Sequence, residues 1–148
     1  MKLLNKVLKR STEDGHFKIA SDLARRYSTC LKINIGAVIV KNKRIVGRGY
    51  NLCSPDGFNH GQKFKECKRI NLPSGQSYDL CKSIHAEIIA LIDAGAKNCR
   101  GATLYLSGHY YPCWNCESHA RQSGIKEIKV RDLFAKEFYK KQLKKTKE

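Results

Sequence analysis

The sequence predicts a three-layer α/β/α domain, in which helices cover both faces of a mixed central sheet of about five strands. After the N-terminal helices, apolar runs of strand length alternate with segments of helical spacing, in the order strand, strand, helix, strand, helix, strand. At 148 residues the chain has the length of one domain and can bury a substantial core. We therefore expect a single domain over residues 1–148.

Two helices are expected before the first strand. Residues 1–12 carry their few apolar side chains at helical spacing, which predicts a short docking helix. From Asp14 to Ser28 apolar residues recur every three or four positions, which predicts a helix of about four turns. The carboxylate of Asp14 is suited to cap the start of that helix.

An antiparallel hairpin is expected next. Ile35–Val40 is almost continuously apolar and rich in β-branched residues, which is typical of a buried strand. Arg44–Tyr50 returns as a second strand, and Asn42-Lys43 between them has the length of a two-residue turn.

The third expected helix begins after a long segment, Leu52–Ile84, of the kind that is usually functional inside a compact domain. This helix covers His85–Ala94, and we expect Ile88, Leu91 and Ile92 on its buried side. Gly95 is suited to end it.

A strand, a helix and another strand follow. The strand covers Ala102–Ser107, the helix residues 113–123 and the second strand Ile125–Val130. Because a crossover helix joins the two strands, we expect them to be parallel. A basic C-terminal helix is expected at about residues 132–148.

Composition points to a cytoplasmic protein with anionic partners. The formal net charge of +16 favours nucleotide phosphates or nucleic acid, although a solvated basic tail accounts for part of it. No apolar run approaches the roughly 18 residues of a membrane span, and the first residues lack a signal-peptide core. In this setting the seven cysteines are expected to be reduced thiols and metal ligands.

Two short motifs supply a set of zinc ligands. His85 offers an imidazole, and Cys113 and Cys116 offer two thiolates, which leaves the fourth tetrahedral position open for water. An open position indicates a catalytic site, because structural zinc sites normally use four protein ligands. Glu87 lies two residues after the histidine, where its carboxylate can move protons without binding the metal.

Neither motif is specific when it stands alone. A His-x-Glu pattern is common by chance, and a single Cys-x-x-Cys is also found in redox pairs and in halves of structural zinc sites. Together, in this order, His85-Ala86-Glu87 and Pro112-Cys113-Trp114-Asn115-Cys116 resemble the signature of zinc nucleobase deaminases.

Further segments resemble the deoxycytidylate deaminase branch of the cytidine deaminase-like superfamily, over roughly Ile35–Val130. The most discriminating is the inserted, cysteine-bearing segment between Cys67 and Cys81, which tRNA adenosine deaminases and free-cytidine deaminases normally lack. The other segments that carry the resemblance are Ile35–Val40, Gly49-Tyr50-Asn51, Ile84–Glu87 and Ser123–Lys126.

The resemblance implies hydrolysis of dCMP to dUMP and ammonia, with dCTP as another candidate substrate. It also implies a zinc cofactor and a homo-oligomer, often a hexamer, that dCTP activates and dTTP inhibits. By position, Asn51 matches the residue that holds the sugar, the backbone at Ala86 matches the group that grips the pyrimidine edge, and Tyr110 or Tyr111 matches the aromatic residue against the base.

The chain departs from the family pattern at two places. Leu52 and Cys53 follow Asn51, where the family usually has a further glycine in a loop associated with the effector nucleotide. Gly61 follows His60, where many members have a cysteine. A second, structural zinc is one hypothesis for the inserted segment, with ligands of suitable type at Cys53, His60, Cys67 and Cys81.

Two other functions remain open. The first is deamination of bases in tRNA or single-stranded nucleic acid, which the positive charge favours. The second is an inactive zinc-binding module, against which Glu87 is the evidence, because a purely structural site needs no general acid or base.

Overall fold

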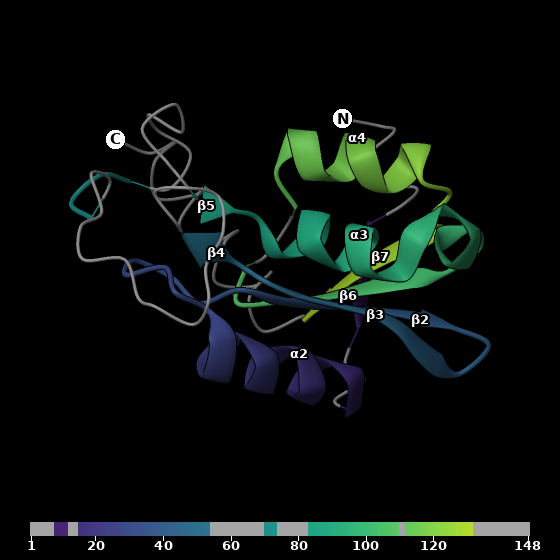
Figure 1. Cartoon of the computed structure of the whole chain (residues 1–148), viewed down its shortest axis with the longest axis horizontal. Helices are drawn as coiled ribbons and strands as arrows, with labels where there is room; N and C mark the ends of the chain where they lie inside the picture. The colour runs from purple at the N-terminus through teal and green to yellow at the C-terminus, as the bar shows by residue number, and fades with distance from the viewer. Residues whose placement is uncertain (1–7, 12–14, 54–69, 74–82, 110–111, 132–148) are drawn as a thin grey trace, which may run out of the picture.

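The computed structural model describes residues 8–11, 15–53, 70–73, 83–109 and 112–131. The elements are β1 (Leu8–Ser11), α2 (Gly15–Tyr27), β2 (Gly36–Lys41), β3 (Arg44–Tyr50), β4 (Leu52–Cys53), β5 (Ser83–Ile84), α3 (Ala86–Cys99), β6 (Thr103–Ser107), α4 (Trp114–Gln122) and β7 (Glu127–Arg131). Five strands form one sheet in the order β1-β7-β6-β2-β3. Helix α2 covers one face of this sheet, and α3 and α4 cover the other (Figure 1). The three-layer prediction is confirmed.

The sheet is mixed, as predicted. Strand β2 is antiparallel to both β3 and β6, whereas β6 and β7 are parallel. Asn42 and Lys43 have φ values of 50° and 64°, the left-handed pair that a tight two-residue hairpin turn requires. The hairpin and the parallel crossover are therefore confirmed.

The fifth strand comes from the N-terminal segment, and the docking helix predicted for residues 1–12 is wrong for Leu8–Ser11. These residues pair in parallel with β7, with Leu8 opposite Ile128. Without them β7 would be an unpaired edge, so sheet pairing overrides the local helical spacing. Residues 1–7 and the predicted cap at Asp14 lie outside the described residues.

Alternating side chains of the strands form two separate apolar layers. Val38 and Tyr105 face α2, where they pack with Phe17 and Ala20. Their chain neighbours point to the other face, where a larger cluster packs under α3 and α4; it includes Ala37, Ile39, Leu104, Leu106, Ile128 and Val130. The sheet is thus buried on both faces by the period-two alternation of its strands.

The buried side of helix α3 is as predicted at Leu91, which is buried, and at Ile88, which packs against the core cluster, but not at Ile92. Ile92 is 75% exposed, and the buried side is formed chiefly by Ala86, Ala90, Leu91 and Ala94. The helix lies close to β3 because Gly49 carries no side chain: a Cβ there would come within 2.0 Å of the Ala86 carbonyl oxygen. Small residues therefore set the contact, and the large Ile92 faces away.

The helical run of α3 is interrupted at Gly95, whose φ of 77° and ψ of 158° are non-helical. The predicted end of the helix at Gly95 is thus a kink, after which a further turn continues to Cys99. Glycine adopts this backbone conformation without steric cost.

Strands β4 and β5 pair antiparallel and join the two ends of the long segment 52–84. Residues 54–69 and 74–82 lie outside the described part, as does the basic helix predicted at 132–148, so the single domain over 1–148 stays a prediction. None of the helices in the described residues has the length and apolar character needed to cross a membrane.

Candidate metal centre

The starts of α3 and α4 bring the three predicted ligands together. His85 is the residue that precedes α3, and Cys113 holds the same position before α4, with Cys116 one turn later. His85 Nδ1 lies 3.2 Å from Cys116 Sγ and 3.5 Å from Cys113 Sγ. All three ligand atoms lie within 4.8 Å of one another.

This geometry fits a tetrahedral zinc ion. Zinc bonds of 2.0–2.3 Å place neighbouring ligand atoms about 3.6 Å apart, close to the separations between His85 and the two cysteines. One imidazole nitrogen and two thiolates form a donor set that zinc prefers, and three protein ligands leave one position open. The helix starts also turn their positive dipole ends toward the thiolates, which favours the charged form.

The first turns of both helices hold these ligands in place. The Ile89 N–H donates to the His85 carbonyl at 3.2 Å, and the Glu117 N–H donates to the Cys113 carbonyl at 3.0 Å. Arg121 pairs with the buried Glu117 at 2.5 Å and ties the first turn of α4 to its last. The ligand positions are therefore set by helix geometry.

Glu87 lies in the first turn of α3 and is 4% exposed. Its carboxyl group makes a hydrogen bond with the Cys116 side chain, so it lies beside the ligand cluster while not being one of its three members. Burial raises the pKa of Glu87 above its usual value, an effect that the Cys116 hydrogen bond partly offsets. A buried carboxyl beside a metal site is suited to accept and release a proton during a reaction.

The two cysteines differ in their protonation when no metal is bound. The hydrogen bond from the Cys116 side chain lowers the pKa of Cys113 to about 4, despite the opposing effect of burial. The Cys116 backbone N–H also donates to Cys113 Sγ, at 3.3 Å. The pKa of Cys116 is raised because its thiol donates to Cys113 and is buried. The lowered pKa favours the thiolate form of Cys113, which is the form that binds a cation.

Asn51 is buried at the end of β3, and its amide is occupied by the chain itself. Its Oδ1 accepts hydrogen bonds from the Ser28 hydroxyl and from the Ile35 N–H, the latter at 2.9 Å. Its Nδ2 donates to the Ile33 carbonyl at 2.8 Å. The side chain therefore fixes the loop between α2 and β2, a role that the sequence did not indicate.

Of the other predicted site residues, the structure describes Ala86 in full and Cys53 in part. Ala86 is the first residue of α3 and is fully buried. Cys53 is described only by its backbone, in β4. Tyr110, Tyr111, His60, Cys67 and Cys81 lie outside the described residues.

A cavity of about 560 Å³ lies beside the ligand cluster, and no sequence pattern indicated it. Its described lining consists of Ser83, Ile84, His85, Ile88, Cys113, Trp114 and Asn115. Trp114 is 78% exposed there and is the single tryptophan of the chain.

Known proteins resemble this chain in both sequence and fold. Residues 10–131 match the family described as "Cytidine and deoxycytidylate deaminase zinc-binding region". A deoxycytidylate deaminase of Schizosaccharomyces pombe is 35% identical over 129 residues, which cover 85% of this chain and 39% of that protein. The deoxycytidylate deaminase of Mycobacterium phage D29 is 30% identical over 82% of this chain and 95% of its own length.

A solved structure supports the same assignment. The apo dCMP deaminase of the cyanophage S-TIM5 superposes with a TM-score of 0.55 and 25% sequence identity, over 80% of this chain and 82% of that one. The chain spans about two fifths of the length of the Schizosaccharomyces pombe protein and of a Saccharomyces cerevisiae deoxycytidylate deaminase that it also matches. The family match covers most of the chain and contains both helix starts that carry the candidate ligands, so this protein belongs to the cytidine and deoxycytidylate deaminase family.

Proposed function

We propose that this chain catalyses the hydrolytic deamination of dCMP to dUMP and ammonia, with one zinc ion held by His85, Cys113 and Cys116. The observation that carries the proposal is the cluster of these three ligand atoms within 4.8 Å, with the buried carboxyl of Glu87 against it. Support for dCMP as substrate comes from the phage D29 relative, a deoxycytidylate deaminase. The match covers 95% of the length of that phage protein.

A zinc ion bound by these residues would lower the pKa of a coordinated water to about 7 and so supply a nucleophile at neutral pH. Glu87 accepts a proton from the attacking water and donates it to N3 of the cytosine ring. Glu87 then takes the remaining proton from the new C4 hydroxyl and delivers it to the amino nitrogen as the bond between C4 and that nitrogen breaks, so that ammonia leaves and the C4 carbonyl of dUMP forms. Its burial excludes bulk water from these transfers.

Substrate positioning is proposed to use the backbone at Ala86 and one of Tyr110 and Tyr111, as the family pattern implies. The amide of Asn51 already makes three hydrogen bonds within the chain. We therefore propose that it contacts the sugar only through the hydrogen-bonding capacity that remains on the amide. Its first role is to shape the wall of the site through the loop that it holds.

The experiment is a panel of ammonia-release assays on dCMP, dCTP, deoxycytidine, CMP and unmodified tRNA. We expect dCMP to be preferred over deoxycytidine, because the nucleoside lacks the phosphate, and over CMP, because of its 2′-hydroxyl. Equal kcat/KM for deoxycytidine and dCMP would exclude phosphate recognition. Turnover of tRNA without turnover of dCMP would establish the alternative, a nucleic-acid base deaminase, which the charge of +16 favours.

Glu87→Gln tests the mechanism within this assay. The variant should keep its zinc and lose turnover by about 10²–10⁴-fold, the usual contribution of a general acid or base. Loss of the metal in this variant would make Glu87 a ligand and contradict the mechanism.

We further propose that dCTP and dTTP regulate the enzyme, that the chain assembles as a hexamer and that it binds a second zinc ion. Adding dCTP or dTTP to the dCMP assay tests the effectors, and light scattering tests the hexamer. Metal analysis tests a second zinc at Cys53, His60, Cys67 and Cys81. Two zinc ions per chain in fully active protein would support that site, and one would exclude it.

A further inference from the structure

The proposed reaction does not account for the positive charge of the chain. Its substrate carries a single phosphate group, whereas the net charge is +16. Six cations of the described residues lie at the end of the sheet where the hairpin turns. We call this set the basic edge: Lys41, Lys43, Arg44, Lys97, Arg100 and Lys126.

Contacts between separate elements bring the basic edge together. Lys41, at the end of β2, donates from Nζ to the Lys97 carbonyl at 3.1 Å. The side chain of Arg100 lies against Gly124, where an added Cβ would come within 3.0 Å of Arg100 Cγ. The Lys126 N–H donates to the Ala102 carbonyl at 2.8 Å, so Lys126 lies next to the segment that follows Arg100.

The basic edge has little carboxylate to neutralise it among the described residues. Asp22 and Glu117 pair with Arg25 and Arg121, which do not belong to the edge. Glu127 is adjacent to Lys126, and further along α3 the Asp93 carboxylate accepts the Arg48 N–H at 2.8 Å. Five of the six cationic residues are exposed, and Lys41 is half-buried. A group of like charges at one end of the molecule favours an anionic partner.

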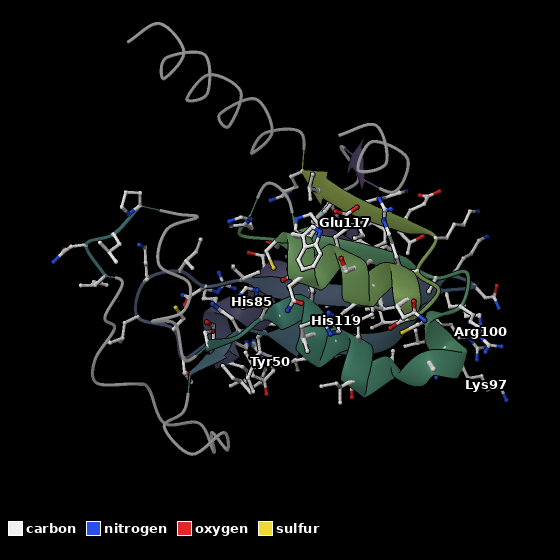
Figure 2. All side chains as sticks on the ribbon, turned by 90° about the horizontal axis from the view of Figure 1, so that it is seen from above. Tyr50, His85, Lys97, Arg100, Glu117 and His119 are labelled. Carbon is white, nitrogen blue, oxygen red and sulfur yellow. The ribbon has the colours of Figure 1, made fainter. Side chains whose placement is uncertain are left out.

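The basic edge is distant from the metal centre. Lys97 and Arg100 lie at one end of the molecule and His85 at the other (Figure 2). Strand β2 also runs from Gly36, opposite Ser107, to Lys41 at the hairpin, so the two sites lie at opposite ends of the strands. Anions bound at the basic edge are therefore not substrates in the catalytic cavity.

We propose that the basic edge binds the phosphate backbone of double-stranded nucleic acid without reading its sequence, an interaction beyond the proposed deaminase activity. Several cations on three rigid elements match a dense row of phosphates better than a single anion. The large apolar residues that are exposed elsewhere in the described chain, such as Trp114 and Tyr27, are not found on this edge. Without an aromatic platform for unstacked bases, the surface favours duplex backbone over single strands.

The test is binding of a fluorescein-labelled 20-base-pair duplex by the full-length, zinc-loaded protein, measured by anisotropy between 50 and 200 mM salt. Six phosphate contacts predict that the affinity falls about 10³-fold over this range. In the triple variant Arg44→Gln, Lys97→Gln, Lys126→Gln the fall should shrink to about 40-fold, since three contacts remain. Its turnover of dCMP should be unchanged.

A matched control removes the same charge from exposed positions away from the edge, as Arg25→Gln, Arg26→Gln, Arg48→Gln. This control should keep the salt dependence of the unmodified protein. Equal losses in both triple variants would show a general effect of net charge and overturn the proposal.

Two further measurements give independent outcomes. Tighter binding of a single-stranded 20-mer than of the duplex, or binding of anionic phospholipid vesicles but no duplex, would also overturn the proposal. Lys97→Gln alone should reduce the salt slope by about 1, so a poorly folded triple variant would not remove the test. Because dCMP turnover is measured separately, failure of this proposal and failure of the deaminase assignment are distinguishable.

Discussion

Asn51 shows how a single buried amide can carry a structural role at a position where a substrate contact is expected. It accepts from Ser28 and Ile35 and donates to Ile33. The short pattern Gly49-Tyr50-Asn51 predicts its position at the end of a strand. It does not reveal these partners, because they lie 16 to 23 residues earlier in the chain.

Asn51→Ala should therefore destabilise the fold as well as impair activity. Partly buried groups such as the Ile35 N–H would lose their partner, at a cost of roughly 2–4 kcal/mol in the free energy of unfolding. Urea denaturation measures this cost, and Ser28→Ala, which removes one of the three bonds, should lose about 1 kcal/mol. Unchanged stability of Asn51→Ala with lost activity would instead assign the amide to the substrate.

Glu87 predicts a pH dependence of stability in the zinc-free protein. Because burial raises its pKa, the folded state holds a proton there that the unfolded state has released above about pH 4.3. The unfolded state thus binds fewer protons, so the stability contributed by this group is present below that pH and falls as pH rises through the folded pKa. Glu87→Gln removes this titration.

The measurement is urea unfolding of zinc-free wild type and Glu87→Gln at several pH values from 4 to 8. The variant should gain stability relative to wild type as pH rises. A constant difference across the range would mean that the carboxyl titrates normally in the fold.

At the scale of elements, the close contact between β3 and α3 determines where the proposed catalytic groups lie. Gly49 passes under the first turn of α3, and a Cβ there would lie 2.0 Å from the Ala86 oxygen and 2.6 Å from the Ala90 nitrogen. Backbone atoms cannot move aside as a flexible side chain can. The start of α3, which carries His85 and Glu87, would have to shift.

Gly49→Ala should accordingly lower kcat/KM by about 10²-fold or more, the usual effect of misplacing catalytic groups by an ångström. The matched control is Gly15→Ala at the start of α2, where an added Cβ meets nothing within 4 Å. Steady-state kinetics on both variants checks this. Wild-type kinetics in Gly49→Ala would mean that α3 moves without consequence for the site.

The match between apolar pattern and burial decided which elements could be predicted from the sequence. Periodicity identified α2, the hairpin, β6, β7 and α4 to within about two residues, because their apolar patterns match their burial. It misassigned Ile92 because the buried side of α3 is made of alanines that pack against glycines, which hydrophobicity alone undervalues. It missed β1 because a short edge strand is stabilised by pairing with β7 and carries little pattern of its own.

At the scale of the whole molecule, the two motifs predicted the ligand cluster because each lies at the start of a helix, where helix geometry fixes the positions of its residues. His85, Cys113 and Cys116 come together once β6 returns the chain from the end of α3 to the start of α4. The basic edge could not be predicted in this way. Its cations are spread from Lys41 to Lys126, and only the sheet register brings them to one end.

Zinc should act as a cross-link between the starts of α3 and α4, and so stabilise the whole domain. A ligand that binds only the folded state at 100 times its Kd adds about 2.7 kcal/mol, which for a chain of this length raises Tm by roughly 5–10 °C. Thermal unfolding of the zinc-loaded protein and of the EDTA-treated protein measures the shift. Cys116→Ala should lose it because a ligand is missing, whereas Cys30→Ala, which changes a half-buried cysteine outside the cluster, should retain it. A full zinc-dependent rise in the Tm of Cys116→Ala would mean that the stabilising ion binds elsewhere. The starts of α3 and α4 would then be held together by packing alone.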